Sequence, residues 1–528
     1  MKDELKYLMA LAARGRYSRR AFLGKAAAAG ITGMVANTML AKAVRAAGPK
    51  KGGTLQMGLG GGESTNSLDP ALAASQVPFL YLMTAGDRLT DMSPTGEVMP
   101  RMAEKIGSSA DAKVWTFTLR KGMTFHDGAP VTADDVVKTM RRHSDENAKS
   151  GALGIMGGIE SVNANGDDVV FTLKSANADF PALMSDYHLI IQPGGGVDKP
   201  DAGIFSGPYK IKSFEPGVRI ELEKFADYWD DSRGHYDAIE MLVINDATAR
   251  NAALQSGQVQ LVNQVDPKVA DLLKRAPGVT VNATAGRGHY VFIMRCNAAP
   301  FDNNDLRMAL KLSIDREEMV QKILSGYGSV GNDFPINKAY PLFDASIPQR
   351  TYDPEKAADY YKKSGHDGSP IILRTADGAF PGAVDAAALF QQSAAKAGIP
   401  LEIKREPNDG YWSDVWNKQP FCASYWGGRP VQDQMYTTAY LSTADWNDTA
   451  FKDPHFDELI VQARGELDQA KRKSLYSEAG LLVRDTGGAI VPMFNDFINA
   501  YSDKVAGWED NPNQDTMNGL AGVLCWEA

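Results

Sequence analysis

The sequence predicts an α/β protein with mixed sheets and more than one domain. Its 528 residues are 44% hydrophobic and 23% charged, which is an ordinary globular composition, and a chain of this length is expected to form two or three domains with large cores. Two strand–helix–strand alternations, typical of mixed α/β layers, support this assignment. They are expected at residues 241–245, 248–255 and 259–262, and again at 371–373, 383–397 and 401–403.

The charge balance and the cysteines narrow the possible functions. The formal net charge is -9, which argues against nucleic acid as a partner because phosphate binding requires clustered cations. Cys296, Cys422 and Cys525 are too few for a disulfide scaffold and lack CxxC spacing. They form either one bridge or free buried thiols.

The first 47 residues have the pattern of an export signal. Ser18-Arg19-Arg20 begins a twin-arginine pattern, which is followed by a weakly apolar run over 26–40 and then by small residues. We therefore expect a twin-arginine signal peptide over 1–47 and a soluble mature protein in a bacterial periplasm. The exact cleavage site stays open within about three residues of position 47. The alternative is an N-terminal amphipathic helix that stays attached.

Residues 115–137 predict a strand, a turn and a helix. Large residues at 115, 117 and 119 alternate with threonines, which is typical of a strand with one buried face. His126-Asp127-Gly128 has the composition of a turn. Thr132 is placed to cap the following helix, and Asp135 is placed to complete a capping box.

Turn and cap signals recur along the rest of the chain. Asn165-Gly166 and Pro216-Gly217, each between apolar runs, predict two β-hairpins. A helix is expected over 77–89, and another after the Asp353-Pro354 pair.

The stretch 119–137, LRKGMTFHDGAPVTADDVV, closely resembles the signature of the family 5 solute-binding proteins of ABC importers, which are the peptide- and nickel-type periplasmic binding proteins. Segments at 100–104, 225–229 and 300–320 resemble the same family, so the resemblance spans nearly the whole chain after the signal. In this setting His126 and Asp127 are interpreted as packing and turn residues.

The resemblance implies a two-lobe periplasmic binding protein of the cluster C type (type II), with mixed sheets, a hinge and an extra subdomain in the first lobe. The first lobe is expected at 48–297, with the subdomain at about 95–205. The second lobe is expected at 298–488, and residues 489–528 are expected to return to the first lobe.

Two lobes joined by chain crossings bind their ligand in the cleft between them. A candidate site lies at the end of a strand expected over 421–425, where a glycine pair interrupts the strand and aromatic and charged side chains follow. The candidate ligand-binding residues are Tyr425, Trp426, Gly427, Gly428, Arg429 and Asp433. Tyr411, Trp412 and Trp416 form a nearby aromatic cluster that we expect to be half core and half cleft.

Arg429 departs from the pattern of the resembled family. In its peptide-binding members, an Asp three residues after the corresponding Trp binds the amino terminus of the peptide, and here that position is Arg429. A guanidinium repels an ammonium and favours a carboxylate or phosphate, so we expect Arg429 to hold an anionic group and Trp426 to pack against the ligand. Asp433 is then expected to bind an amine. The alternatives are an internal ion pair for Arg429 and core roles for Tyr425 and Trp426.

The resemblance implies the solute-binding component of an ABC importer, which captures a short peptide or related small ligand and delivers it to a permease and ATPase complex. A receptor for an acidic amino-acid derivative, opine-like compound or sugar conjugate is one alternative, and a binding fold used as a chaperone or sensor is another. We expect a monomer without cofactor or metal; a nickel-complex ligand has no sequence support, because the seven histidines are scattered. The ligand itself stays undetermined.

A secreted hydrolase is the alternative from another class. Ser393 and Lys396 match the SxxK pattern of serine acyl-transfer enzymes, but the partner motifs occur in the wrong order. No catalytic residues are therefore assigned.

Overall fold

The computed structural model describes residues 48–528, apart from 146, 148 and 467, and also residues 9, 22 and 24–26. The predicted twin-arginine signal over 1–47 lies outside the described residues, apart from those five positions. Within the described part of the chain, no helix has both the length and the apolar character needed to cross a membrane.

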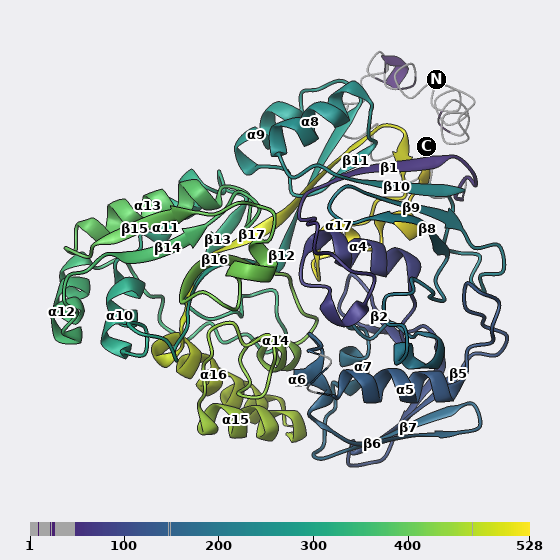
Figure 1. Ribbon diagram of the computed structural model, residues 1–528, viewed down its shortest axis with the longest axis horizontal. Coiled ribbons are helices and arrows are strands. Elements are labelled where there is room, and N and C mark those ends of the chain that lie inside the picture. The colour runs from purple at the N-terminus through teal and green to yellow at the C-terminus, as the bar shows by residue number, and fades with distance from the viewer. Residues whose placement is uncertain are drawn as a thin grey trace.

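One mixed sheet of eleven strands runs through the whole molecule (Figure 1). Its strand order is β15-β14-β16-β12-β17-β11-β1-β10-β9-β8, and β13 pairs with β17 at the side. The two long central strands are β12 (Val279–Met294) and β17 (Ala489–Ser502), which pair antiparallel and connect the two halves of the sheet.

The pairing of β12 with β17 is interrupted in the middle of the molecule. Ala285 pairs with Asp496 and His289 with Phe494, so Gly286, Arg287 and Gly288 lie opposite one residue of β17. A bulge of this kind bends a strand and increases its twist. The two halves of the sheet therefore change direction at this bulge.

The first half of the sheet lies to the right in Figure 1. Its other strands are β1 (Thr54–Leu59), β8 (Tyr209–Glu215), β9 (Arg219–Lys224), β10 (Ala238–Val243) and β11 (Leu261–Val262). Short helices cover it: α4 (Gln76–Ala85), α8 (Ala247–Ser256), α9 (Pro267–Leu273), α17 (Asp515–Asn518) and α18 (Ala521–Leu524). C-terminal residues such as Val523 and Cys525 share its core with Leu55 and Met57, so the chain returns to this half.

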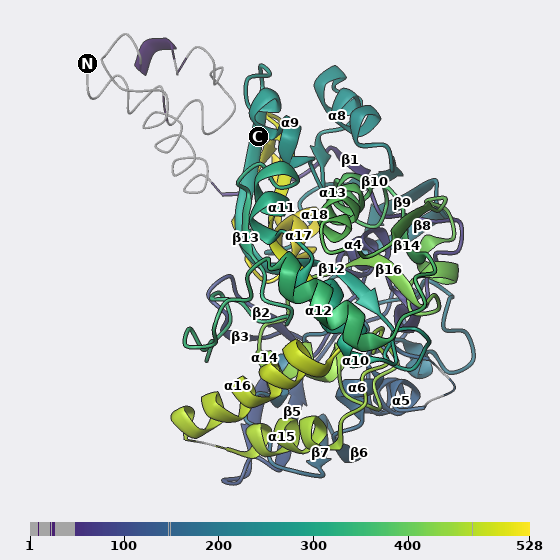
Figure 2. The same ribbon diagram turned by 90° about the vertical axis from the view of Figure 1, so that its left-hand side faces the viewer.

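The second half has its own, larger core (Figures 1 and 2). Its strands are β13 (Gly328–Val330), β14 (Ile371–Thr375), β15 (Leu401–Arg405) and β16 (Phe421–Trp426). Its helices are α10 (Asn304–Leu312), α11 (Arg316–Lys322), α12 (Pro354–Ser364), α13 (Ala383–Ala395), α14 (Gln432–Ala439), α15 (Pro454–Gly465) and α16 (Gln469–Thr486). The parallel pair β14 and β15 is connected by α13, as the second predicted alternation requires.

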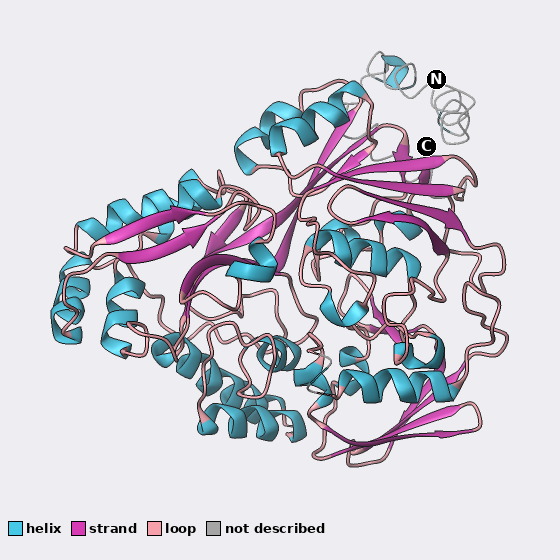
Figure 3. Ribbon diagram, in the orientation of Figure 1, coloured by secondary structure: helices cyan, strands magenta, loops and turns pink. Residues whose placement is uncertain are grey.

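A separate antiparallel sheet of four strands lies beside the first half (Figure 3). Its order is β4-β5-β7-β6, with bounds Ala103–Ser108, Val114–Leu119, Asp168–Leu173 and Ile159–Asn165, and it packs with α5 (Ala133–His143) around a core of its own. Thr132 and Asp135 form the predicted capping box, with bonds of 3.2 and 2.9 Å. Two-stranded ribbons complete the fold: β2 (Thr90–Met92) with β3 (Val98–Pro100), and β18 (Val505–Ala506) with β19 (Trp526–Glu527).

One predicted helix is shorter in the structure, and the three cysteines form no disulfide. The helix expected over 77–89 is shorter, because α4 ends at Ala85 and Gly86 takes an extended conformation. Cys296, Cys422 and Cys525 are free thiols, which settles the choice left open by their number. The predicted lobe boundaries stay predictions.

Candidate ligand-binding site

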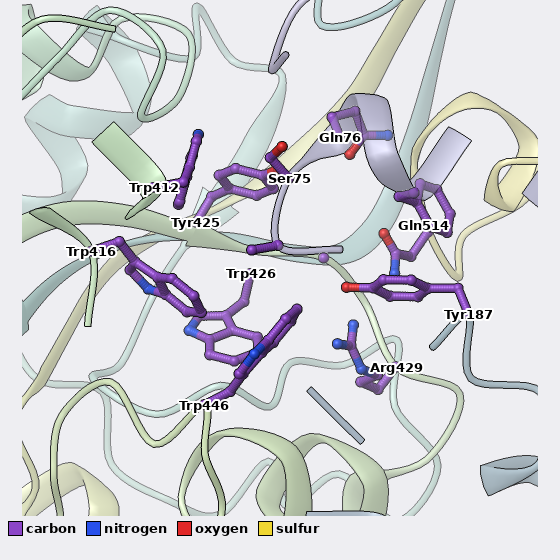
Figure 4. Close-up of a pocket in the computed structure, with 13 residues that line it drawn as sticks. Ser75, Gln76, Tyr187, Trp412, Trp416, Tyr425, Trp426, Arg429, Trp446 and Gln514 are labelled. Atoms are coloured by element: carbon purple, nitrogen blue, oxygen red, sulfur yellow. The ribbon is translucent and has the colours of Figure 1, made fainter. Parts of the chain in front are cut away.

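A pocket lies between the two halves of the molecule (Figure 4). The first half contributes the start of α4 and Tyr187, and the second half contributes the end of β16 and four tryptophans. Its lining residues are Ala74, Ser75, Gln76, Phe79, Tyr187, Trp412, Trp416, Tyr425, Trp426, Gly427, Arg429, Trp446 and Gln514. A concave site walled by aromatic rings with a few polar groups is typical of small-ligand binding.

Strand β16 positions the predicted site residues. It pairs antiparallel with β12, placing Tyr425 opposite Tyr290 and Trp426 opposite His289, so the two aromatic side chains emerge on opposite faces. The strand ends at Trp426, and close packing against the backbone of Asn513 requires glycine at Gly428, whereas Gly427 meets only the flexible end of the Gln514 side chain. A Cβ on Gly427 would lie 2.5 Å from Gln514 Oε1, and one on Gly428 would lie 2.0 Å from the carbonyl oxygen of Asn513.

Three tryptophans form one wall of the pocket. The ring centroids of Trp416, Trp426 and Trp446 lie 5.4 to 6.2 Å apart. The indoles of Trp416 and Trp426 both donate to Oδ2 of Asp448, at 2.9 and 3.1 Å. Burial raises the pKa of Asp448 to about 7, although both hydrogen bonds favour its ionised form. Asp448 therefore fixes the orientation of two rings that face the ligand space.

Arg429 is the cation of the pocket wall. Its side chain is 4% exposed, and its guanidinium lies 5.7 Å from the ring centroid of Tyr187 and 5.9 Å from that of Trp426. Nη1 donates to the carbonyl of Gly428 at 3.1 Å, whereas Nε has no hydrogen-bond partner among the described residues. Figure 4 shows the guanidinium pointing toward the middle of the pocket beside Tyr187.

The carboxylate nearest to Arg429 is already bonded to other groups. Asp186 Oδ2 lies 3.9 Å from Arg429 Nε, but it accepts a bond of 2.9 Å from Gln434, and Oδ1 accepts one of 2.6 Å from His188. Burial alone would raise the pKa of Asp186, but His188 and Arg429 hold it well below its usual range. The ion pair predicted as the alternative for Arg429 is thus present only as a long contact.

Two more buried donors of the pocket lack partners. Ser75 Oγ and Gln76 Nε2, at the start of α4, have no hydrogen-bond partner among the described residues. A buried polar group without a partner costs free energy, and a bound ligand is one way to satisfy it. Together with Arg429 Nε, these donors suit a ligand that is rich in acceptors.

Asp433 lies elsewhere. It is fully buried in α14, and Oδ1 accepts a bond of 2.6 Å from Nε of Arg464, which is itself buried. The geometry gives Asp433 an internal ion pair instead of the amine-binding role that the sequence suggested. Gly428 likewise packs against Asn513 instead of lining the pocket.

The aromatic cluster divides between core and pocket. Trp412 and Trp416 line the pocket, whereas Tyr411 is fully buried and donates to the carbonyl of Ala423 at 2.8 Å. No sequence pattern pointed to Tyr187, Trp446 or Gln514, which reach the pocket from loops far apart in the chain. Gln76, which was also not predicted, lies at the start of α4, which faces the pocket.

Direct bonds connect the two halves at the rim of the pocket. Glu63 accepts a hydrogen bond from the backbone N–H of Trp412 at 3.0 Å, and Ser64 donates to Asp409 at 2.8 Å. Burial raises the pKa of Glu63 to about 6. Among the described residues, no group of three or more His, Cys, Asp or Glu side chains could hold a metal ion.

Two halves that share the long central strands β12 and β17, with a pocket walled by aromatic rings at their junction, have the architecture of a two-lobe binding protein. Residues 97–448 match the family model described as bacterial extracellular solute-binding proteins, family 5 middle. The chain belongs to this family, as the signature at 119–137 predicted.

Three known proteins that are similar to this chain show the same kind of protein and the same fold. The di/tripeptide-binding protein 1 of Pseudomonas aeruginosa is 25% identical over 461 residues, which cover 80% of this chain and 86% of the relative. The Helicobacter pylori protein DppA, in complex with the peptide STSA, superposes with a TM-score of 0.82 at 22% identity, over 90% of this chain and 99% of that one. AgaA from A. tumefaciens R10, in complex with agropinic acid, gives 0.81 at 22% identity, over 90% and 99%. These likenesses establish the two-lobe fold.

Proposed function

We propose that the protein is the solute receptor of an ABC importer. It captures a short peptide or related small ligand in the pocket between its lobes and delivers it to a permease and ATPase complex. The observation that carries the proposal is the pocket itself, because its walls come from both lobes and a ligand that touches both favours closure.

Arg429 defines the ligand more closely. A buried guanidinium with an unpartnered Nε is suited to a carboxylate, and the unpartnered donors of Ser75 and Gln76 lie across the same pocket (Figure 4). Trp426 and its two neighbouring indoles then provide an apolar surface for the body of the ligand. Trp426, Arg429 and Tyr425 are the side chains that we assign to ligand contact, with Gly427 allowing the close approach of the backbone.

A second candidate ligand is an acidic amino-acid derivative or opine-like compound. The observation that favours it is the presence of Arg429 where the peptide-binding members of the family carry an acid. Agropinic acid is the ligand of one protein with the same fold, and a peptide is the ligand of another. Both kinds of ligand carry carboxylates, so both are compatible with the arginine.

The receptor performs no chemistry on its ligand. Ser393 of the SxxK motif is buried in α13 and donates to the carbonyl of Phe390 at 3.0 Å, which leaves it without access to a substrate. Lys396 lies over the ring of Tyr352, with 5.8 Å between Nζ and the ring centroid. Neither geometry resembles an activated nucleophile with its base.

We further propose the cellular setting that the sequence suggested. The twin-arginine signal over 1–47 exports the protein to the periplasm, where it acts as a monomer. The lobes are assigned to 48–297 together with 489–528, and to 298–488. This division matches the positions of the central strands β12 and β17.

A thermal-shift screen tests the proposed function. The purified protein is screened with alanine di- and tripeptides, glutamyl dipeptides and mannopinic acid, and at least one is expected to raise Tm. Arg429→Gln is expected to reduce that shift strongly. The matched control is Arg405→Gln, an exposed arginine on β15 that pairs with Asp377. Failure of every probe, or an unchanged shift in Arg429→Gln, would contradict the proposal.

A further inference from the structure

A second cavity lies in the first half of the molecule, outside the pocket between the lobes. It has a volume of about 330 Å³ and is formed by the ribbon of β2 and β3, the loop before β10 and the C-terminal segment 509–524 (Figure 2). The described residues that line it include none of those that line the pocket between the lobes. Ligand pockets typically have volumes of about 300–1,000 Å³, so this cavity is large enough for a small molecule.

The floor of the cavity is apolar. Met92, Met517 and Leu520 line it and are each 4% exposed. Met99 also lines it but is 47% exposed, which marks the side where the cavity opens to solvent. Methionine side chains are flexible and polarisable, so they adapt to ligands of different shape. A floor of this kind is suited to an unbranched alkyl chain.

The backbone that carries Met517 is held in a costly conformation. Thr516, Met517 and Asn518 have φ values of 54°, 60° and 59°, in the left-handed region that non-glycine residues seldom occupy. Such strain persists only where surrounding contacts fix it, and it is concentrated at functional segments. The chain thus keeps Met517 in the cavity wall at a cost in free energy.

Two donors on the polar side of the cavity have unused bonding capacity. Asn511 is 6% exposed, and its Oδ1 accepts a bond of 3.0 Å from the backbone N–H of Asn513, whereas its Nδ2 bonds to no other described residue. Arg233 binds Asp91 through Nη2 at 2.5 Å, and its Nη1 likewise has no partner in the described part of the chain. Both side chains line the cavity. A ligand with an acceptor group would satisfy both donors.

The charges around the cavity permit an anionic acceptor. Burial alone would raise the pKa of Asp91, but the charges of three neighbouring arginines hold it well below its usual range. These arginines are Arg88, Arg101 and Arg233. The carboxylate of Asp91 is therefore neutralised. Glu509, the other acid that lines the cavity, is exposed, so water and salt screen its charge.

We propose that this cavity is a second binding site, which takes a medium-chain carboxylic acid. The alkyl chain lies on Met92, Met517 and Leu520, where its burial supplies most of the binding free energy. The carboxylate accepts hydrogen bonds from Arg233 and Asn511, and the bond from the guanidinium is charge-assisted. This site is separate from the pocket between the lobes and does not depend on the function proposed for that pocket.

The C-terminal segment lies between the two sites. Asn511 lines the cavity, and Gln514 lines the pocket between the lobes. Asn513 donates to the carbonyl of Ser93 at 3.0 Å and accepts a hydrogen bond from Arg287 in the bulge of β12. An acid bound in the cavity is therefore expected to reduce local opening of this segment.

Calorimetry with octanoate tests the proposal. One octanoate is expected to bind per chain. Acetate lacks the alkyl chain and octylamine carries the opposite charge, so each is expected to bind at least about tenfold more weakly. Amide hydrogen exchange is expected to slow in the octanoate complex at 509–524 and in the ribbon of β2 and β3. Equal binding of octylamine, or slower exchange only around the pocket between the lobes, would overturn the proposal.

Two substitutions in the cavity are expected to weaken octanoate binding by at least about fivefold. Asn511→Asp keeps the acceptor for the N–H of Asn513 but replaces the free donor with an acceptor. Met99→Glu places a like charge at an exposed position of the cavity wall. The matched control is Leu272→Glu, which puts the same charge on α9 at a residue that is 65% exposed and lies outside the cavity. It is expected to bind octanoate like the wild type.

A further variant separates this site from the pocket between the lobes, because octanoate is itself a carboxylate. Arg429→Gln is expected to bind octanoate like the wild type. Loss of binding in Arg429→Gln, with unchanged binding in Asn511→Asp, would place octanoate between the lobes and overturn the proposal. Unchanged binding in both Asn511→Asp and Met99→Glu would overturn it as well. Either result leaves the proposed solute receptor standing.

Flotation with phosphatidylglycerol vesicles distinguishes a free acid from the acyl chain of a lipid. The wild-type protein is expected to stay in the soluble fraction. Flotation of the wild type that is lost in Met99→Glu would assign the cavity to a membrane lipid and overturn the proposal of a free acid.

Discussion

Arg429 and Asp433 lie four positions apart, are both almost completely buried, and have opposite surroundings. Asp433 is bonded at 2.6 Å to Arg464, which is also buried, so its charge is neutralised within one lobe. Arg429 reaches its nearest carboxylate only at 3.9 Å and across the lobe junction, and its Nε is unpartnered. Each side chain has one unpartnered polar atom, Asp433 Oδ2 and Arg429 Nε, so the two differ in the distance to the opposite charge, which is 2.6 Å for Asp433 and 3.9 Å for Arg429.

The largest effect is expected from breaking the short ion pair between Asp433 and Arg464. Asp433→Ala leaves Arg464 buried without its carboxylate, which should lower the free energy of unfolding by about 3–5 kcal/mol. Urea denaturation measures this, and Asp503→Ala, which changes an exposed acid, is the control. Ligand affinity per folded molecule should stay unchanged. A stable Asp433→Ala protein with weakened binding would instead place Asp433 in the site.

The long contact between Arg429 and Asp186 should behave in the opposite way. Arg429→Gln is expected to change the free energy of unfolding by less than about 1 kcal/mol, because Asp186 keeps its bonds from His188 and Gln434. The same substitution should cost about 2–3 kcal/mol in ligand binding, since it removes a charged contact in a desolvated site. Calorimetry and urea denaturation on the same protein give both values. Strong destabilisation with unchanged affinity would assign Arg429 to the structure.

Asp448 is a third buried charged residue of this region, and its hydrogen-bond donors are two neutral indoles and not a cation. Its pKa is raised to about 7 in the folded protein, so protonation favours the folded state and this stabilisation is lost as pH rises through that value. Between pH 6 and 7 the loss should be about 1 kcal/mol. Asp448→Asn should remove this part of the pH dependence. Glu63 and Asp515, both with raised pKa values near 6, contribute a background of the same sign in both proteins. Identical pH profiles of unfolding free energy for the two proteins would be inconsistent with this assignment.

The smallest effect is expected at the rim of the pocket. Ser64 is exposed and donates to Asp409 across the lobes at 2.8 Å. Because water competes for exposed hydrogen bonds, Ser64→Ala should weaken ligand binding by no more than about threefold. A loss as large as that of Arg429→Gln would mean that lobe closure, and not contact with the arginine, dominates affinity.

The sequence predicted the fold far better than the site. Periodicity, glycine turns and caps are local signals, so the strand at Val114–Leu119 and the capping box of Thr132 and Asp135 were predicted correctly. Arg429 and Trp426 were found because they follow a recognisable strand end. Tyr187 and Gln514 were missed, because only tertiary packing brings their loops to the pocket. The ion pair of Asp433 with Arg464 was not predicted, because nothing near Asp433 in the sequence points to Arg464.

A crystal structure of the protein with the strongest stabilising ligand tests the binding site most directly. The ligand is expected between the lobes, with a carboxylate oxygen within hydrogen-bond distance of Arg429 and its body against the indole of Trp426. A ligand bound outside the junction of the lobes, or one that leaves Arg429 without a direct contact, would contradict the proposed site.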